Sequence, residues 1–233
     1  MRFKMPGTAR LRWQHQYRII ATRYPPIDLF ERLDLDDTQK RALWALQGRI
    51  NPRLRQAAGD LERVRPEDMV SGPGASTVMA AFTHTGFPSR FTDGAFGIYY
   101  ASRRLETAIR ETVFHRERDA RERGIPAQEF DMRAFIGTVK KPLYDVRRGY
   151  PALHDPDPAS YPVAQAWTRQ LLDRDPDAWG IVFNSVRHEG GECIAALRPP
   201  AVSLPTQGPL LSYVWDGERV TEVYEKSGPL LRF

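Results

Sequence analysis

The chain has little of what stabilises a secreted protein or anchors a protein in a membrane. Its 233 residues include a single cysteine, Cys193, so neither a disulfide framework nor a multi-cysteine metal site is expected. The longest apolar runs, such as 78–82, are too short to span a bilayer. The N-terminal segment is basic, but no apolar stretch follows it, which argues against a signal peptide. We therefore expect a cytoplasmic protein that does not enter a membrane.

The motifs of several enzyme classes are also missing. The glycine-rich stretch 72–74 lacks the Gly-Lys-Ser/Thr that completes a phosphate-binding loop. Ser185 is not surrounded by a Gly-x-Ser-x-Gly motif, so we do not expect a hydrolase triad. Glu111 and His115 stand four positions apart, but two ligands without a third do not predict a zinc site. No metal is expected.

What the chain does contain is apolar residues in quantity and many arginines. An apolar share of 41% in a chain of this length is enough for a substantial core. We expect one domain over 1–233. The net charge is +5, from 34 basic and 29 acidic residues. This excess is a weak indication of nucleic-acid binding, and it agrees equally well with a site for a phosphorylated small molecule, because arginine pairs with two phosphate oxygens at once.

Residue patterns predict an α+β fold. Helical residues are expected at 27–64, 75–82, 103–122 and 161–173, and strands at 15–22, 97–101, 129–140, 179–186, 191–198, 211–215 and 219–224. Ser102 is the expected N-cap of the second long helix, and Asp216-Gly217 predicts a two-residue hairpin turn. The order is not a regular βαβ alternation. It indicates a mixed or mostly antiparallel sheet, with a helical insertion at 27–65 after the first strand.

The segment 89–115 holds the densest set of residues able to support chemistry. On a helix beginning at 103, Glu111 falls beside the apolar stripe, with His115 one turn later on the same side. A carboxylate at the margin of a core is where the protein can tune a local field. The alternative is an ordinary solvated glutamate.

Three other positions are candidates for a binding cleft. Arg90 precedes a turn at 92–94 that can bring it back beside the strand at 97–101. Tyr99 and Tyr100 point to opposite faces of that strand, so only one of them can line a cleft. Ser185 is expected to contact a ligand or to orient another side chain. The alternatives are a loop salt bridge for the arginine, core packing for the tyrosine and plain turn chemistry for the serine.

Together these segments resemble the RES-domain family, the toxins of bacterial Xre–RES toxin–antitoxin pairs. The resemblance lies in 17–19, 89–94, 97–111 and 184–193. The family's arginine, tyrosine and glutamate occur in order at Arg90, Tyr100 and Glu111, and the spacing of eleven positions favours Tyr100 over Tyr99. The likeness covers most of 75–200 and the opening strand. It departs from the family at 91–92, where Phe-Thr replaces a frequent Trp-Asn.

The resemblance implies a fold similar to ADP-ribosyltransferase toxins and NAD⁺ as substrate, with no further cofactor. By this likeness Glu111 would be the catalytic carboxylate, and Arg18 and Arg90 would bind the pyrophosphate. Tyr100 would pack against the nicotinamide or its ribose, and Ser185 would be a polar contact in the pocket. The implied partner is a cognate Xre-type helix-turn-helix antitoxin whose tail blocks the cleft, while the toxin itself need not touch nucleic acid. The sequence leaves the oligomeric state open, a homodimer included.

Several functions remain open at this level. Hydrolysis or phosphorolysis of NAD⁺ competes with ADP-ribosyl transfer to a cellular protein, for which Glu189 and Glu192 are the candidates to hold the acceptor. A basic nucleic-acid-binding protein or nuclease would need a continuous basic face with aromatic residues. Here the arginines alternate with acids, as in 116–119, which is typical of a solvated helix. A third alternative is a non-catalytic interaction domain with 27–65 as its docking surface.

Overall fold

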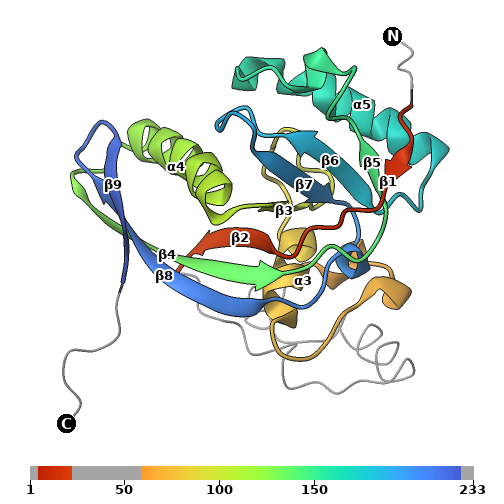
Figure 1. Cartoon of the computed structure of the whole chain (residues 1–233), viewed down its shortest axis with the longest axis horizontal. Coiled ribbons are helices and arrows are strands. Elements are labelled where there is room, and N and C mark those ends of the chain that lie inside the picture. The colour runs from red at the N-terminus through yellow and green to blue at the C-terminus, as the bar shows by residue number, and fades with distance from the viewer. Residues whose placement is uncertain (1–4, 23–58, 227–233) are drawn as a thin grey trace.

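The computed structural model describes residues 5–22 and 59–226 and shows an α+β domain built on one mixed sheet (Figure 1). Along the sheet the nine strands of these residues lie in the order β1-β5-β6-β7-β3-β2-β4-β8-β9. The strands are β1 (Thr8–Ala9), β2 (Gln16–Ala21), β3 (Tyr99–Ser102), β4 (Gln128–Gly137), β5 (Leu143–Asp145), β6 (Gly180–Asn184), β7 (Glu192–Ala196), β8 (Thr206–Trp215) and β9 (Val220–Glu225). Neighbours pair antiparallel except β5 and β6, which are parallel. The expected fold class, a mixed and mostly antiparallel sheet, is confirmed.

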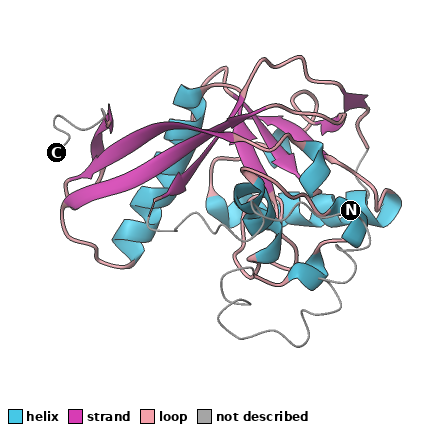
Figure 2. Cartoon of the chain, turned by 90° about the horizontal axis from the view of Figure 1, so that it is seen from below, coloured by secondary structure: helices cyan, strands magenta, loops and turns pink. Residues whose placement is uncertain are grey.

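Three α-helices pack on this sheet within the described residues. They are α3 (Ala75–Thr83), α4 (Leu105–Glu122) and α5 (Tyr161–Arg174). None of these helices combines the length and the apolar character that crossing a bilayer requires. Viewed from below, in Figure 2, the strands run past one another with the twist normal for sheets, and helices lie on either side.

Alternation along the strands divides the interior into separate cores. Successive side chains of a strand point to opposite faces. Val182 and Ile194 therefore pack with α3 on one face, whereas Phe183 and Ala195 pack with α5 on the other. A third core, beneath α4, is formed with β2, β4 and β8 by Ile19, Ala21, Ala108, Met132, Ala134, Leu211 and Tyr213. In Figure 1, α4 and α5 lie above the sheet and α3 lies below it, so the upper face carries both long helices.

Several predicted boundaries are wrong for local reasons. Ser102 is not the N-cap of α4 but the buried last residue of β3, with its Oγ 3.3 Å from the Sγ of Cys193. The helix begins at Leu105, and its N-cap is Arg104, whose side chain makes no capping hydrogen bond. The β8–β9 hairpin is present, but its loop spans 216–219, because strand pairing ends at Trp215 and Val220.

The beginning of the chain also differs from the prediction. The short strand β1 precedes the strand expected to be first, so the insertion follows the second strand of the sheet. The greater part of the predicted insertion, 23–58, lies outside the described residues. At its end, Gly59 has a left-handed φ of 72° and Leu61–Arg63 form a 3₁₀ helix. The α-helical conformation predicted over 27–64 therefore does not continue to residue 64.

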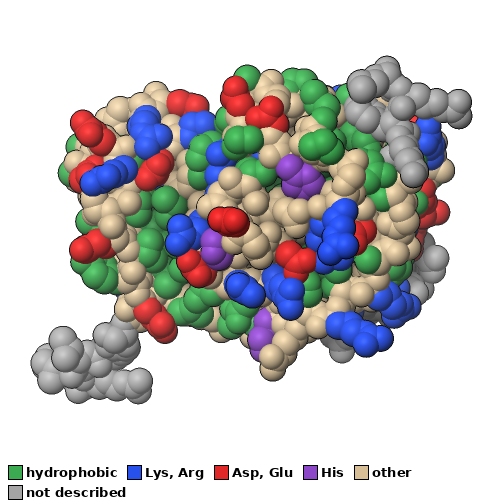
Figure 3. Space-filling model, turned by 45° about the horizontal axis from the view of Figure 1, so that its top comes forward, with side chains coloured by type: hydrophobic (Ala, Val, Ile, Leu, Met, Phe, Trp, Pro, Cys, Tyr) green, Lys and Arg blue, Asp and Glu red, His purple; other side chains and the backbone are tan. Residues whose placement is uncertain are grey.

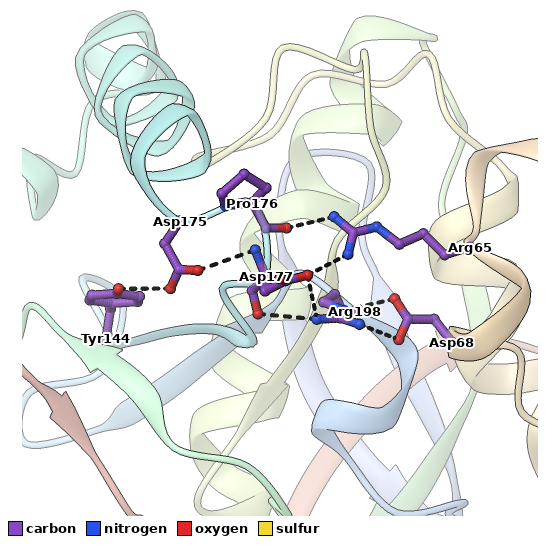
Figure 4. Close-up of polar contacts among 7 residues, drawn as sticks. All are labelled: Arg65, Asp68, Tyr144, Asp175, Pro176, Asp177 and Arg198. Atoms are coloured by element: carbon purple, nitrogen blue, oxygen red, sulfur yellow. Dashed lines mark hydrogen bonds and ion pairs between the residues drawn. The ribbon is translucent and has the colours of Figure 1, made fainter.

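A network of charged side chains joins the segment before α3 to the loop after α5 (Figure 4). The guanidinium group of Arg198 donates to both carboxylate oxygens of Asp68, at 2.7 and 2.8 Å, and this carboxylate is almost fully buried. Arg65 pairs with Asp177, which also accepts from Arg198 at 3.1 Å. The two-point pair fixes the segment before α3 to Arg198, which follows β7, and Asp177 ties the loop after α5 to both.

Candidate functional site

A cavity of about 290 Å³ lies on the α4 side of the sheet, between that helix, β2, β3 and the segment 88–90. Its polar and ionisable lining residues are Tyr17, Arg18, Ser89, Arg90, Tyr100, Ser102, Glu111, Thr112, His115, Arg118, Tyr161 and Cys193. Four of the five predicted site residues are in this set. The fifth, Ser185, contacts the cavity through Glu111.

Glu111 is held in place by a serine from a distant turn. The apolar stripe of α4 packs on the third core, and the carboxylate emerges beside it into the cavity. The hydroxyl of Ser185 donates to Glu111 Oε1 at 2.6 Å. Ser185 Oγ itself accepts the backbone N–H groups of Arg187 at 3.1 Å and His188 at 3.0 Å. Both lone pairs of Ser185 are thus occupied, so this serine orients a carboxylate and is not a nucleophile.

Tyr100, rather than Tyr99, lines the cavity. Tyr100 exchanges a 2.8 Å hydrogen bond with Ser89 Oγ and accepts the N–H of Phe91 at 3.2 Å. Burial raises the pKa of Tyr100 to about 12, so the phenol stays protonated. Tyr99 is completely buried in the α3 core, where its hydroxyl accepts from the amide of Gln16 at 2.9 Å. The strand therefore presents one tyrosine to each face, as alternation requires.

Arg90 is buried at the edge of the cavity and is fixed by the loop that precedes α5. Its Nη1 donates to the carbonyl oxygens of Leu153 at 3.1 Å and Asp155 at 2.8 Å. The guanidinium carbon lies 4.8 Å from the centre of the Tyr161 ring, within the range of a cation–π contact. These contacts hold the positive charge in one orientation.

Arg18 of β2 is among the residues that line the cavity, but its guanidinium group packs on the opposite, α3 face of the sheet, where Tyr99 also lies. Its Nη1 donates to the carbonyl of Tyr100 at 3.1 Å, and its guanidinium carbon lies 4.6 Å from the centre of the Tyr99 ring. The buried Nε has no hydrogen-bond partner among residues 5–22 and 59–226. Burial lowers the pKa of this group from its usual value. The guanidinium group therefore does not lie with Glu111, Arg90 and Tyr100 on the cavity face of the sheet.

The structure adds cavity residues that the sequence analysis did not select. Arg118 stands seven positions after Glu111, two helical turns along the same side, and this spacing was the available signal. Tyr161 comes from α5, and nothing in the sequence pattern placed it here.

Desolvation, together with the charge of nearby arginines, Arg118 foremost, lowers the pKa of His115, so the imidazole is neutral near pH 7. The lining therefore carries an excess of positive charge around one carboxylate.

The cavity offers neither a reactive thiol nor a metal centre. Cys193 is buried at its base, and burial, reinforced by the charge of Glu111, raises the pKa of the thiol, which disfavours the nucleophilic thiolate. Among the residues that the structure describes, no group of three or more His, Cys, Asp or Glu side chains is placed to hold a metal ion.

The charged surface does not support the nucleic-acid alternative. Arginines of α4 pair with acids of the same helix, as Arg110 does with Glu106 at 2.8 Å and Arg121 with Glu117 at 2.8 Å. In the face shown in Figure 3, basic and acidic side chains are intermixed. Of the two acceptor-site candidates, Glu192 is paired with two arginines, whereas Glu189 is exposed. A continuous basic face is absent from the described part of α4.

Comparison with known proteins identifies the family. Residues 60–216 match the model of the RES domain, which is most of the chain, and the protein belongs to the RES-domain family. A curated relative, the uncharacterized protein y4oC of Sinorhizobium fredii, is 25% identical over 214 residues, covering 89% of this chain and 86% of the relative. The family match includes Arg90, Tyr100, Glu111 and Ser185, whereas Arg18 precedes it.

Proposed function

We propose that the protein cleaves the nicotinamide–ribose bond of NAD⁺. The observation that carries this proposal is the placement of the Glu111 carboxylate, fixed by Ser185, in one cavity with Arg90 and Tyr100. Membership of the RES-domain family supports it. The site combines a fixed anion, positive groups suited to a diphosphate and an aromatic ring suited to a flat base.

The chemistry needs one carboxylate rather than a pair. When the bond between C1′ and the pyridinium nitrogen breaks, its electron pair leaves with nicotinamide, which departs as a neutral molecule. The ribose acquires oxocarbenium character, and the Glu111 anion stabilises that charge as it develops. Within the described residues Oε2 accepts no hydrogen bond, so it can accept one from a ribose hydroxyl. Water then bonds to C1′ and releases its proton, which yields ADP-ribose.

Substrate binding follows from the remaining groups. Arg90 neutralises the diphosphate, with Arg118 at the same cavity as a second positive charge. Arg18, which the family resemblance implies as a further pyrophosphate ligand, would have to turn away from the Tyr99 ring to join them. The ring of Tyr100 packs against the nicotinamide or its ribose. A cavity of about 290 Å³ is close to the lower limit for ligand pockets, about 300 Å³, so it accommodates the nicotinamide riboside end while the adenosine lies outside.

In this proposal the protein is the toxin of a toxin–antitoxin pair and has an ADP-ribosyltransferase-like fold. Loss of NAD⁺ in the cytoplasm would arrest the cell that makes it. A cognate Xre-type helix-turn-helix antitoxin would restrain it by placing its tail in the cavity. Co-expression with such a partner should restore growth and prevent nicotinamide release.

The direct test follows nicotinamide release from NAD⁺ by the purified protein. Glu111→Gln removes the charge with little change in shape, and we expect kcat to fall by about 10²–10³. Glu117→Gln is the matched control, because this α4 glutamate does not line the cavity and should leave kcat within about twofold. Equal activity of the wild type and Glu111→Gln would remove the assignment.

A second measurement separates cleavage from transfer. NAD⁺ labelled in its adenine half is incubated with the protein and with cell extract. Label recovered as free ADP-ribose supports hydrolysis, and label recovered as ADP-ribose phosphate indicates phosphorolysis. Label retained on a protein band in proportion to the nicotinamide released would replace the proposal with ADP-ribosyl transfer.

A further inference from the structure

We propose that Thr107 and His188 are positioning residues that hold the β6–β7 turn against α4 and thereby fix the carboxylate of Glu111. The catalytic consequence of this inference rests on the proposed function. The contact itself does not, because it concerns how one turn of the protein is docked on one helix.

The turn meets α4 at two points on the same side of the helix. Thr107 and Glu111 are four positions apart, so their side chains lie one above the other. Thr107 is completely buried, and its Oγ1 lies 2.9 Å from Nδ1 of His188. Glu111 accepts the hydroxyl of Ser185, 2.6 Å away, from the same turn. One face of α4 therefore contacts the β6–β7 turn twice, at Ser185 through Glu111 and at His188 through Thr107.

His188 links the two contact points. Its ring binds Thr107, while its backbone N–H donates to Ser185 Oγ at 3.0 Å. Glu106 Oε1 lies 3.6 Å from the other ring nitrogen, Nε2. A displacement of the His188 ring therefore moves the backbone N–H that holds Ser185, and Ser185 in turn holds the carboxylate.

The turn is tightly closed and pressed against the helix. The amide of Ser185 donates to the carbonyl of Gly191 at 2.8 Å, and the amide of Gly191 donates to the carbonyl of His188 at 2.9 Å. A Cβ on Gly191 would lie 2.7 Å from Cγ2 of Thr107, closer than such atoms approach one another. The absence of a side chain at Gly191 is thus what lets the turn dock on Thr107.

Removing the hydroxyl of Thr107 should affect catalysis more than binding. A misplacement of about 1 Å at a reacting group can cost a factor of about 10² in rate. Arg90 donates to the carbonyl of Leu153 and Tyr100 shares a hydrogen bond with Ser89, so neither depends on the β6–β7 turn. We therefore expect kcat for nicotinamide release to fall about tenfold in Thr107→Val, with KM for NAD⁺ within about twofold of the wild-type value.

Thr107→Ser is the matched control, because it keeps the hydroxyl and loses a methyl group. It should restore kcat to within about threefold of wild type. If Thr107→Ser falls as far as Thr107→Val, packing and not the hydrogen bond is responsible, and the inference is wrong. His188→Asn retains a polar atom near the position of Nδ1, whereas His188→Ala does not. These two His188 variants test the inference if Thr107→Val fails to fold. We expect a higher kcat in His188→Asn than in His188→Ala, and equal kcat values would contradict the inference.

Amide hydrogen exchange gives a readout that does not depend on NAD⁺. The N–H groups of Arg187 and His188 donate to Ser185 Oγ and should be protected in the wild type and in Thr107→Ser. In Thr107→Val they should exchange at least about tenfold faster, while amides of β4 remain unchanged. Unchanged protection in Thr107→Val overturns the inference. Absence of NAD⁺ turnover in the wild type would instead overturn the proposed function, and the exchange comparison would still decide the docking of the turn.

Discussion

Ser185 and Glu111 are 74 positions apart in the sequence, yet the serine hydroxyl lies 2.6 Å from the glutamate carboxylate. Because two backbone N–H groups already occupy the lone pairs of Ser185, its own proton can only be donated outward, toward the carboxylate. The bond fixes the orientation of the Glu111 carboxylate. The helix α4 and the β6–β7 turn, which are far apart in the chain, are thus joined at the Glu111 carboxylate.

Removing the Ser185 hydroxyl should therefore impair the carboxylate. A hydrogen bond to a charged group contributes about 1.5–3 kcal/mol, so we expect Ser185→Ala to lower kcat for nicotinamide release about tenfold or more. Ser203→Ala is the matched control, since the Ser203 hydroxyl also accepts a backbone N–H, from Thr138 at 2.9 Å, and does not line the cavity. Steady-state kinetics of both variants checks the prediction, and a similar loss in both would contradict it.

His154 should make the folded state sensitive to acid. Its Nε2 accepts the backbone N–H of Asn184 at 3.1 Å, and its Nδ1 lies 2.9 Å from the backbone carbonyl of Tyr150. A ring nitrogen that accepts carries no proton, so the native imidazole is neutral. Burial lowers the pKa of His154, and the charge of Arg90 lowers it further. Since the unfolded chain binds this proton near pH 6.5, stability is lost as the pH falls from about 6.5 toward the native pKa.

The measurement is the free energy of unfolding in urea between pH 5 and pH 8. His154→Gln should show a shallower decline below pH 6.5 than the wild type, because one proton-linked contribution is gone. The exposed His84 provides the control, and His84→Gln should follow the wild-type curve. A parallel decline in His154→Gln and the wild type would show that another group is responsible.

The ion pair between Arg198 and Asp68 should contribute far more to stability than its exposed neighbour. The Asp68 side chain is 4% exposed, so Arg198→Met leaves a buried charge without its partner, at a cost of about 3–5 kcal/mol. Arg65→Met removes an arginine whose pair with Asp177 is largely exposed, and we expect a loss of at most about 1 kcal/mol. Urea unfolding of the two variants compares them directly (Figure 4). Equal losses of unfolding free energy in the two variants would mean that the buried Asp68 carboxylate does not depend on Arg198.

The sequence allowed part of the site to be predicted because some of its residues are locally related. Strand alternation predicted that only one of Tyr99 and Tyr100 lines a cleft, and the spacing implied by the family resemblance favoured Tyr100. The structure places Tyr100 in the cavity. Helical periodicity put Glu111 beside the apolar stripe of α4. The role of Ser185 was left between ligand contact and orientation of a side chain, and the geometry shows the second. Tyr161 carried no local signal, because it comes from another helix.

The errors in the fold have similar causes. The strands β1 and β5 have two and three residues, too few for alternation to be recognised. Ser102 has the side chain of an N-cap, but the pairing of β3 with β7 continues through it, so the sheet takes the residue that the helix was expected to use. Propensity is a weak preference, and tertiary hydrogen bonds override it.

The kinds of elements, the mixed sheet, the resemblance to the RES-domain family and the residue types available for chemistry could all be inferred from the amino-acid order. These properties follow from the periodicity of apolar residues and from short spacings, which are local. Three contacts needed the folded arrangement: Ser185 with Glu111, Arg90 with the loop before α5, and Thr107 with His188. Such contacts join segments far apart in the chain, and their geometry depends on how whole elements pack, which no local pattern encodes.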